Sequence, residues 1–156
     1  MRLALEEREL AGDARHRAVE RSDLAALGEL MVAAYRGTVD DEGETVEDAV
    51  GELEGVLGGS YGPFSPDASF VAKADDGLVG ASLVAIADSR PLLLYLVVRP
   101  DAKRRGVGTS LLVGTGNALR EGGHAELELF VTEANEPAVN LYRKLGFQVV
   151  DRIVGP

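Results

Sequence analysis

Cysteine is absent from this sequence of 156 residues. A chain without thiols has no disulfide framework, no thiolate metal site and no cysteine nucleophile. Long apolar runs are absent too. The longest, LLLYLVV over residues 92–98, falls far short of the ~20 residues that span a bilayer and has the length of a buried strand. Residues 1–10 carry charged side chains after Leu5 and lack the form of a signal peptide. We therefore expect a cytoplasmic protein without a membrane partner.

Basic residues are also scarce. The chain has 16 Lys and Arg against 26 Asp and Glu, which gives a formal net charge of −10. Binding to a nucleic-acid backbone needs clustered positive charge, so a nucleic-acid partner is disfavoured. The exception is the consecutive run of Lys103, Arg104 and Arg105. This run is compatible with a small anionic ligand and equally with a solvated loop.

The pattern of the chain predicts one domain over residues 1–156, because no repeat or low-complexity linker interrupts it. Ser22 is a candidate N-cap for a helix that ends near Tyr35. Thr45 with Asp48 resembles a capping box that opens a second helix. Apolar periodicity predicts helices over 107–122 and 135–145, and strands over 16–20, 70–74, 78–87, 92–98, 125–132 and 147–153. This order predicts an α/β fold in which a mixed sheet carries helices on both faces.

The segment RPDAKRRGVGTSLLVG, residues 99–114, combines fixed positive charge with glycines at the start of a predicted helix. A helix N-terminus exposes unpaired N–H groups and carries partial positive charge, so it attracts anions. Gly106 and Gly108 would let an anion approach the backbone. The P-loop spacing fails because no Lys-Ser or Lys-Thr follows either glycine, and the dinucleotide fingerprint fails because position 111 is Leu.

Two segments resemble the GNAT-type N-acetyltransferase family. VVRPDAKRRGVGTSLL resembles the family's acetyl-coenzyme A segment, with Lys103 where the family has Arg or Gln. NEPAVNLYRKLGF, residues 135–147, resembles its Asn-x-x-Ala-x-x-Leu-Tyr-x-x-x-Gly-Phe pattern, and the opening HRAVERSDLAAL is weakly similar. The resemblance implies a splayed mixed sheet of six to seven strands, acetyl-CoA as co-substrate and no metal.

The resemblance also implies a binding mode. The strands over 92–98 and 125–132 would splay apart, and the pantetheine arm would pair with the backbone of Leu96, Val97 and Val98. The pyrophosphate would lie on the cationic turn, which consists of Lys103, Arg104, Arg105, Gly106, Val107, Gly108 and Thr109. Asn135 would contact the pantetheine arm or the carbonyl region of the cofactor. An Asn followed by Pro137 just inside a helix is also a simple N-cap, and both roles are compatible.

For catalysis, the resemblance implies that the Val98 N–H stabilises the oxyanion and that Tyr142 protonates the departing thiolate. An unperturbed Tyr has a pKa of about 10 and a thiol about 8.5, so this proton transfer is uphill by roughly 2 kcal/mol. The alternative for Tyr142 is membership of the apolar helix stripe that contains Ala138, Leu141 and Leu145.

No acid lies on the strand over 92–98, where many relatives carry a Glu that acts as general base. Other candidates, each also explicable as a surface residue, are His16, His124, Glu126, Glu128 and Glu133. A chain of water molecules to solvent is the default.

Six acids without a base lie in TVDDEGETVED, residues 38–48. In this family such a connection borders the acceptor site, where it would concentrate a cationic amine. An ordinary solvated loop is the alternative. Tyr35, Tyr61 and Phe64 would line the same pocket or belong to the core.

The expected function is acetyl transfer from acetyl-CoA to a primary amine of a small-molecule or peptide acceptor, by direct attack in a ternary complex. The alternative is a non-catalytic module that binds or senses acyl-CoA. A third interpretation treats the turn as a helix cap in a structural protein. Homodimers are common in the family, but the sequence shows no evident interface patch.

Overall fold

The computed structural model describes residues 1–5 and 15–150. The helices are α1 (Leu24–Tyr35), α2 (Val46–Leu57), α3 (Val107–Glu121) and α4 (Glu136–Lys144), with short 3-10 helices η1 (Arg21–Asp23) and η2 (Pro100–Ala102). The strands are β1 (Arg2–Ala4), β2 (Arg15–Ala18), β3 (Phe70–Ala74), β4 (Gly77–Ala87), β5 (Arg90–Val98) and β6 (Glu126–Leu129). Within the described residues, no helix is long and apolar enough to cross a membrane.

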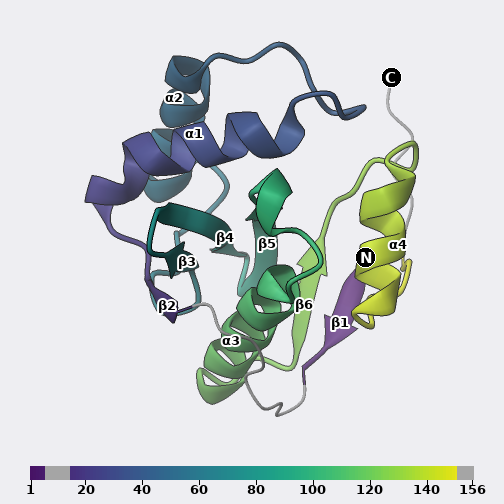
Figure 1. Ribbon diagram of the computed structural model, residues 1–156. Coiled ribbons are helices and arrows are strands. Elements are labelled where there is room, and N and C mark those ends of the chain that lie inside the picture. Colours follow the sequence, from purple (N-terminus) through teal and green to yellow (C-terminus); the bar gives the residue numbers. More distant parts are fainter. Residues whose placement is uncertain (6–14, 151–156) are drawn as a thin grey trace.

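The six strands form one open sheet in the order β1-β6-β5-β4-β3-β2 (Figure 1). All neighbouring pairs are antiparallel except β5 and β6, which are parallel and joined by α3. A parallel pair needs such a crossover, because its strands cannot be joined by a tight turn. The mixed sheet expected from the sequence is therefore confirmed.

Helices cover both faces of this sheet. Alternate residues of a strand point to opposite faces. Val71 and Val97 pack with α1 and α2, whereas Ala72 and Leu96, their neighbours in the chain, pack with α3. The apolar residues of α4 pack on the same cluster as those of the C-terminal half of α3. Figure 1 shows α1 and α2 at one end of the molecule and α3 and α4 around β5, β6 and β1.

Helix α3 lies unusually close to β4 at Gly80. A Cβ atom at this position would lie 2.8 Å from side-chain carbons of Val107 and Leu111. One turn later, the Thr115 hydroxyl lies 2.8 Å from that of Ser82 and donates to the Ala68 carbonyl at 2.7 Å. These contacts fix where α3 begins relative to the sheet.

The start of α1 differs from the prediction, because Ser22 is not its N-cap. Asp23 accepts two hydrogen bonds from the Arg17 guanidinium, at 2.6 and 2.8 Å, and one from the Glu20 N–H at 2.8 Å. The reciprocal capping box therefore opens η1 at Glu20, and α1 continues from it. The Arg17 hydrogen bonds lower the pKa of Asp23. The Thr45–Asp48 capping box of α2 is confirmed.

The predicted strand over 147–153 is wrong for its described part. Between 147 and 150, only Gln148 pairs, as an isolated bridge with Arg2, and residues 151–153 lie outside the described residues. The three-residue β1 is too short to support a longer ladder there. The strand predicted over 125–132 is shorter than expected. Because β5 diverges from β6 beyond Leu129, residues 130–132 have no pairing strand on that side.

Candidate active site

Strands β5 and β6 separate in the middle of the sheet. They pair at only two positions, Leu92 with Glu128 and Leu93 with Leu129. Beyond these, β5 runs on to Val98 with β4 as its only neighbouring strand among the described residues. The last part of β5 therefore lines an opening in the sheet, which is the splay that the family resemblance implies (Figure 1).

The register decides which β5 backbone groups face this opening. The Arg99 N–H donates to the Val79 carbonyl at 2.8 Å. In an antiparallel ladder, hydrogen-bonded pairs alternate with pairs that face away. Val97, opposite Ala81, therefore directs its N–H and C=O toward β4, and those of Leu96 and Val98 are directed toward the opening. The expectation that Val97 offers backbone groups there is wrong, and its side chain is buried in the core.

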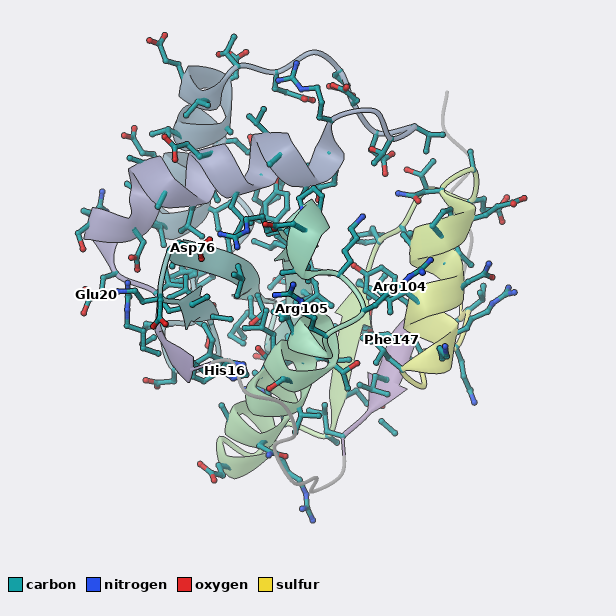
Figure 2. All side chains as sticks on the ribbon, viewed as in Figure 1. His16, Glu20, Asp76, Arg104, Arg105 and Phe147 are labelled. Carbon is teal, nitrogen blue, oxygen red and sulfur yellow. The ribbon has the colours of Figure 1, made fainter. Side chains whose placement is uncertain are left out.

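The cationic turn follows β5 and η2 and leads into α3. Arg104 has φ 68° and Gly106 has φ 77°, so two left-handed residues bend the chain into the helix. The Ser110 N–H is bonded to the Gly106 carbonyl at 2.9 Å, which leaves the amides of Val107, Gly108 and Thr109 ahead of the first helical bond. Figure 2 shows the side chains of Arg104 and Arg105 where α3 begins.

The side chains of the turn are solvent-exposed at Lys103, Arg104 and Arg105. Gly108 lies against the end of β5, where an added Cβ would be 3.5 Å from Cγ2 of Val98. The unpaired amides, three cationic side chains and the outward groups of Val98 therefore lie in one continuous region. Such a region can hold the phosphates of an extended anionic ligand.

Asn135 caps α4 and also holds a distant loop. Its Oδ1 accepts from the Ala138 N–H at 3.3 Å, as the capping interpretation predicts. Its Nδ2 donates to Oδ2 of Asp40 at 2.6 Å. Asn135 thereby joins α4 to the acidic connection between α1 and α2.

Tyr142 lies on α4 with its ring half-buried. It packs edge-on against Phe147, with ring centroids 5.5 Å apart and an interplanar angle of 72°. Burial raises the pKa of Tyr142 to about 12. Burial also raises the pKa of Tyr35 on α1, and the Tyr142 hydroxyl contributes to that rise. Both hydroxyls therefore remain protonated donors at neutral pH.

A cavity of about 380 Å³ lies between α1, α2, their connection and β5. It is lined by Met31, Val32, Tyr35, Asp40, Glu42, Glu44, Asp48, Ala49, Glu52 and Tyr95. Five of these ten residues are acidic and none is basic, so the lining carries an excess of negative charge that would attract a cation. Tyr35 and four of the six acids of residues 38–48 line this cavity, whereas Tyr61 and Phe64 are not among the lining residues.

Sequence reasoning missed Glu52 and Tyr95. Glu52 lies four residues after Asp48, so the capping box already placed both on one face of α2. Tyr95 directly precedes Leu96 on β5, and strand alternation places it on the α1–α2 face. Both signals were present in the chain, but the sequence did not show that these faces meet at one cavity.

The predicted candidates for a general base lie elsewhere. Glu126 and Glu128 form ion pairs with Arg2 of β1, at 2.6 and 3.0 Å. Nε2 of His16 lies 3.1 Å from the Ser110 hydroxyl, and burial lowers the pKa of His16. His124 and Glu133, like these three, are not among the residues that line the acidic cavity.

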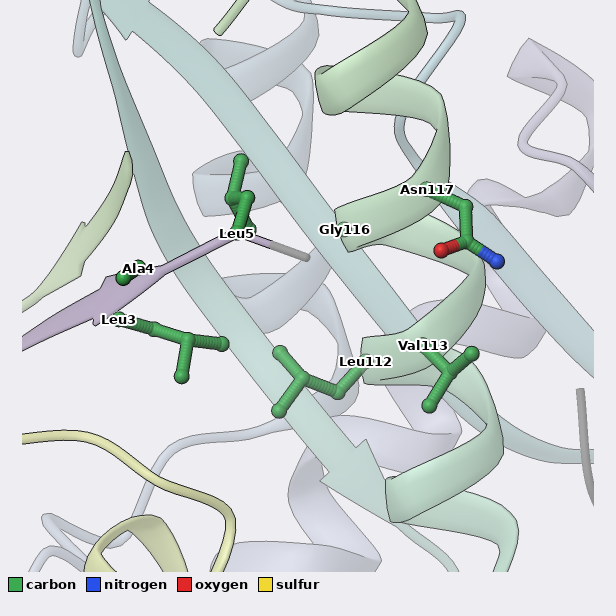
Figure 3. A pocket seen from close by; sticks show the side chains of 7 residues that line it. All are labelled: Leu3, Ala4, Leu5, Leu112, Val113, Gly116 and Asn117. Carbon is green, nitrogen blue, oxygen red and sulfur yellow. The ribbon is translucent and has the colours of Figure 1, made fainter. Parts of the chain in front are cut away.

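A second, much smaller cavity lies between β1 and α3. It measures about 10 Å³ and is lined by Leu3, Ala4, Leu5, Leu112, Val113, Gly116 and Asn117 (Figure 3). This space holds one water molecule at most, so it is a packing gap and not a ligand site.

The chain matches the Acetyltransferase (GNAT) domain over residues 65–149. It belongs to the GNAT acetyltransferase family. Both motifs that suggested the family, the cationic turn and the segment from Asn135 to Phe147, lie inside the matched residues of this GNAT domain.

Relatives of this GNAT domain include larger acetyltransferases. The mycothiol acetyltransferase of Clavibacter sepedonicus is 35% identical over 86 residues, which are 54% of this chain and 28% of that protein. The streptothricin acetyltransferase of Streptomyces lavendulae is 33% identical over 92 residues, 57% of this chain and 49% of that protein. The chain thus spans less than a third of the first relative and about half of the second.

Solved GNAT structures share the fold. The PaiA N-acetyltransferase from Thermoplasma acidophilum, in complex with coenzyme A, has a TM-score of 0.73 at 22% identity, covering 90% of this chain and 93% of that one. The aminoglycoside N-acetyltransferase AAC(6')-Iy, in complex with CoA, has a TM-score of 0.69 at 19% identity, covering 94% and 95%. The expected α/β fold, a splayed mixed sheet of six strands with helices on both faces, is confirmed.

Proposed function

We propose that this GNAT domain transfers an acetyl group from acetyl-CoA to a primary amine in a ternary complex. One observation supports this most strongly. The terminal half of β5 contacts the acidic cavity at Tyr95, lines the sheet opening at Leu96 and Val98, and leads directly into the cationic turn. An anionic cofactor and a cationic acceptor would therefore meet along four residues of one strand.

The cofactor would bind along this path. The pyrophosphate would accept hydrogen bonds from the amides of Val107, Gly108 and Thr109, with the three cationic side chains of the turn around it. The pantetheine arm would pair with the outward backbone groups of Leu96 and Val98, as a peptide adds to a sheet edge. Asn135 would contact the same arm.

The reaction needs a neutral amine, a donor for the oxyanion and a stable leaving group. The amine nitrogen would attack the thioester carbonyl, and the Val98 N–H would stabilise the resulting oxyanion. The C–S bond then breaks, coenzyme A leaves as a thiolate, and the nitrogen loses its extra proton to water. No covalent enzyme intermediate is needed.

Tyr142 suits hydrogen-bond donation to the departing sulfur better than full proton transfer. Its pKa of about 12 lies well above the thiol value of about 8.5, so complete transfer is uphill by about 5 kcal/mol. A protonated hydroxyl that only donates a hydrogen bond avoids this cost. The contribution of Tyr142 to the rate should therefore be modest.

A calorimetric titration with acetyl-CoA tests the cofactor site. Gly108→Glu places a carboxylate among the amides of the turn, and Gly51→Glu on α2, where an added Cβ meets nothing within 4 Å, is the matched control. We expect saturable binding by the wild type and the control, and loss of binding in Gly108→Glu. Wild-type protein that does not bind acetyl-CoA would refute the proposal. Binding without turnover of any amine would favour the alternative, an acyl-CoA-binding module.

A further inference from the structure

Glu52 differs from the other acids of the cavity in how it is held. Its Oε1 accepts hydrogen bonds from two phenol groups, Tyr61 at 2.5 Å and Tyr95 at 3.2 Å. Tyr61 lies in the loop after α2, and Tyr95 lies on β5. Two donors from separate segments fix the orientation of the carboxylate through Oε1. The other oxygen, Oε2, can still accept hydrogen bonds from a ligand.

Three of the four other acids of the cavity accept hydrogen bonds from the protein itself. Glu44 accepts from the Glu42 N–H at 3.2 Å. Asp40 accepts from Asn135, and Asp48 accepts from the Thr45 N–H in the capping box. Within the described residues, no Lys or Arg forms an ion pair with Glu52. A half-buried carboxylate that is oriented by phenols, faces a cavity and has no cationic partner is suited to bind a cation from outside.

The cation that fits is an ammonium group other than the one that reacts. The amine that attacks must be neutral, whereas a fixed carboxylate stabilises the protonated form. A cavity of about 380 Å³ with apolar residues such as Met31 and Ala49 can also hold the carbon chain of a small molecule. The acceptor would then span from Glu52 to the thioester beside Val98.

We propose that Glu52 binds a second, non-reacting ammonium group of the acceptor, so that this enzyme selects small molecules with two or more amino groups. The expected effect of Glu52 on KM rests on the proposed function, whereas its expected effect on amine binding does not. Glu52 acts here as a specificity-determining residue that contacts the substrate.

The test compares 1,4-diaminobutane with butylamine, which has the same chain length and one amino group. Calorimetry in the presence of coenzyme A gives the affinities, and initial rates with acetyl-CoA give KM and kcat. The variants are Glu52→Gln, which keeps an oxygen acceptor for Tyr61 and Tyr95, and Glu54→Gln, an exposed position on the same helix, as control. Acetyl-CoA affinity, measured alongside, reports that each variant is folded.

We expect the wild type and Glu54→Gln to bind the diamine more tightly than the monoamine, by about tenfold, as for a hydrogen bond to a charged group. Glu52→Gln should lose this preference through a higher diamine KM, with little change in kcat. Equal diamine affinity in Glu52→Gln and Glu54→Gln, or no wild-type preference, would overturn the inference. Glu52-dependent diamine binding without acetylation would support the inference and refute the proposed transferase activity on such amines.

Discussion

Asn135 and Asp40 are joined by a hydrogen bond of 2.6 Å between Nδ2 and Oδ2, although 95 residues separate them in the chain. The bond connects the start of α4 to the acidic connection between α1 and α2, which borders the cavity. Asn135 also caps α4 through its other side-chain atom. One amide therefore stabilises a helix and positions a wall of the cavity.

The two functions of Asn135 are separable by mutation. Asn135→Ala removes both bonds and should lower the free energy of unfolding by about 1 kcal/mol, the usual loss for an N-cap. Asn135→Ser keeps an N-cap oxygen but is too short for Asp40, so its stability should fall between those of Asn135→Ala and the wild type. Both variants should raise the KM for the amine. Urea unfolding measures the stability of the variants, and initial rates measure the KM. Equal stability of Asn135→Ala and the wild type would contradict the role of Asn135 as an N-cap.

The two glycines of the cationic turn should respond in opposite ways to alanine. Gly106 has φ 77°, a conformation that is strained for an L residue, so Gly106→Ala should lower stability by about 1 kcal/mol. Gly108 is helical, and its added Cβ would make an ordinary contact with Val98 at 3.5 Å. Gly108→Ala should therefore match or exceed wild-type stability, because alanine favours a helix over glycine. Thermal unfolding measures the stability of the two variants. A Gly106→Ala protein more stable than Gly108→Ala would show that backbone strain at Gly106 does not determine their relative stability.

Tyr142→Phe tests the role of the hydroxyl. Removing a hydrogen bond to the departing sulfur should lower kcat by about tenfold and leave acetyl-CoA affinity nearly unchanged. The ring still packs against Phe147, so stability should be retained. An unchanged kcat would exclude Tyr142 from the reaction. A far larger loss would instead favour complete proton transfer.

Much of this arrangement was predictable from the sequence, because it depends on local chemistry. Helix α2 follows from its capping box at Thr45, and the cationic turn follows from its glycines and charges. The cap at Asn135 follows from residue type and spacing. Each of these features is decided within a few residues of the chain.

The remainder depends on contacts between distant segments. The start of α1 was mispredicted at Ser22 because Asp23 is held by Arg17 from the neighbouring strand β2. The backbone direction of Val97 depends on its register with β4, which no local pattern encodes. Glu52 became a candidate for binding the acceptor only because the fold places Tyr95 beside it.

The buried tyrosines predict how stability depends on pH. The pKa values of Tyr35, Tyr95 and Tyr142 are all raised, in each case first by burial. An unfolded Tyr titrates near 10. The folded state therefore keeps protons that the unfolded state loses above pH 10, and stability must fall as pH rises through this range. Below pH 10 these groups are protonated in both states, so they contribute no slope.

Urea unfolding between pH 8 and 11.5 measures this dependence. We expect a decline in the free energy of unfolding that begins near pH 10, and a shallower decline in Tyr142→Phe, which removes one of the groups. Tyr61 is an exposed phenol, so Tyr61→Phe should remove less of the slope and serves as the matched control. Parallel curves for the wild type and Tyr142→Phe would mean that the Tyr142 hydroxyl titrates alike in the folded and unfolded chain. Its ring would then be packed against Phe147 with the hydroxyl in water, and hydrogen bonding to a sulfur in the sheet opening would lose its structural support.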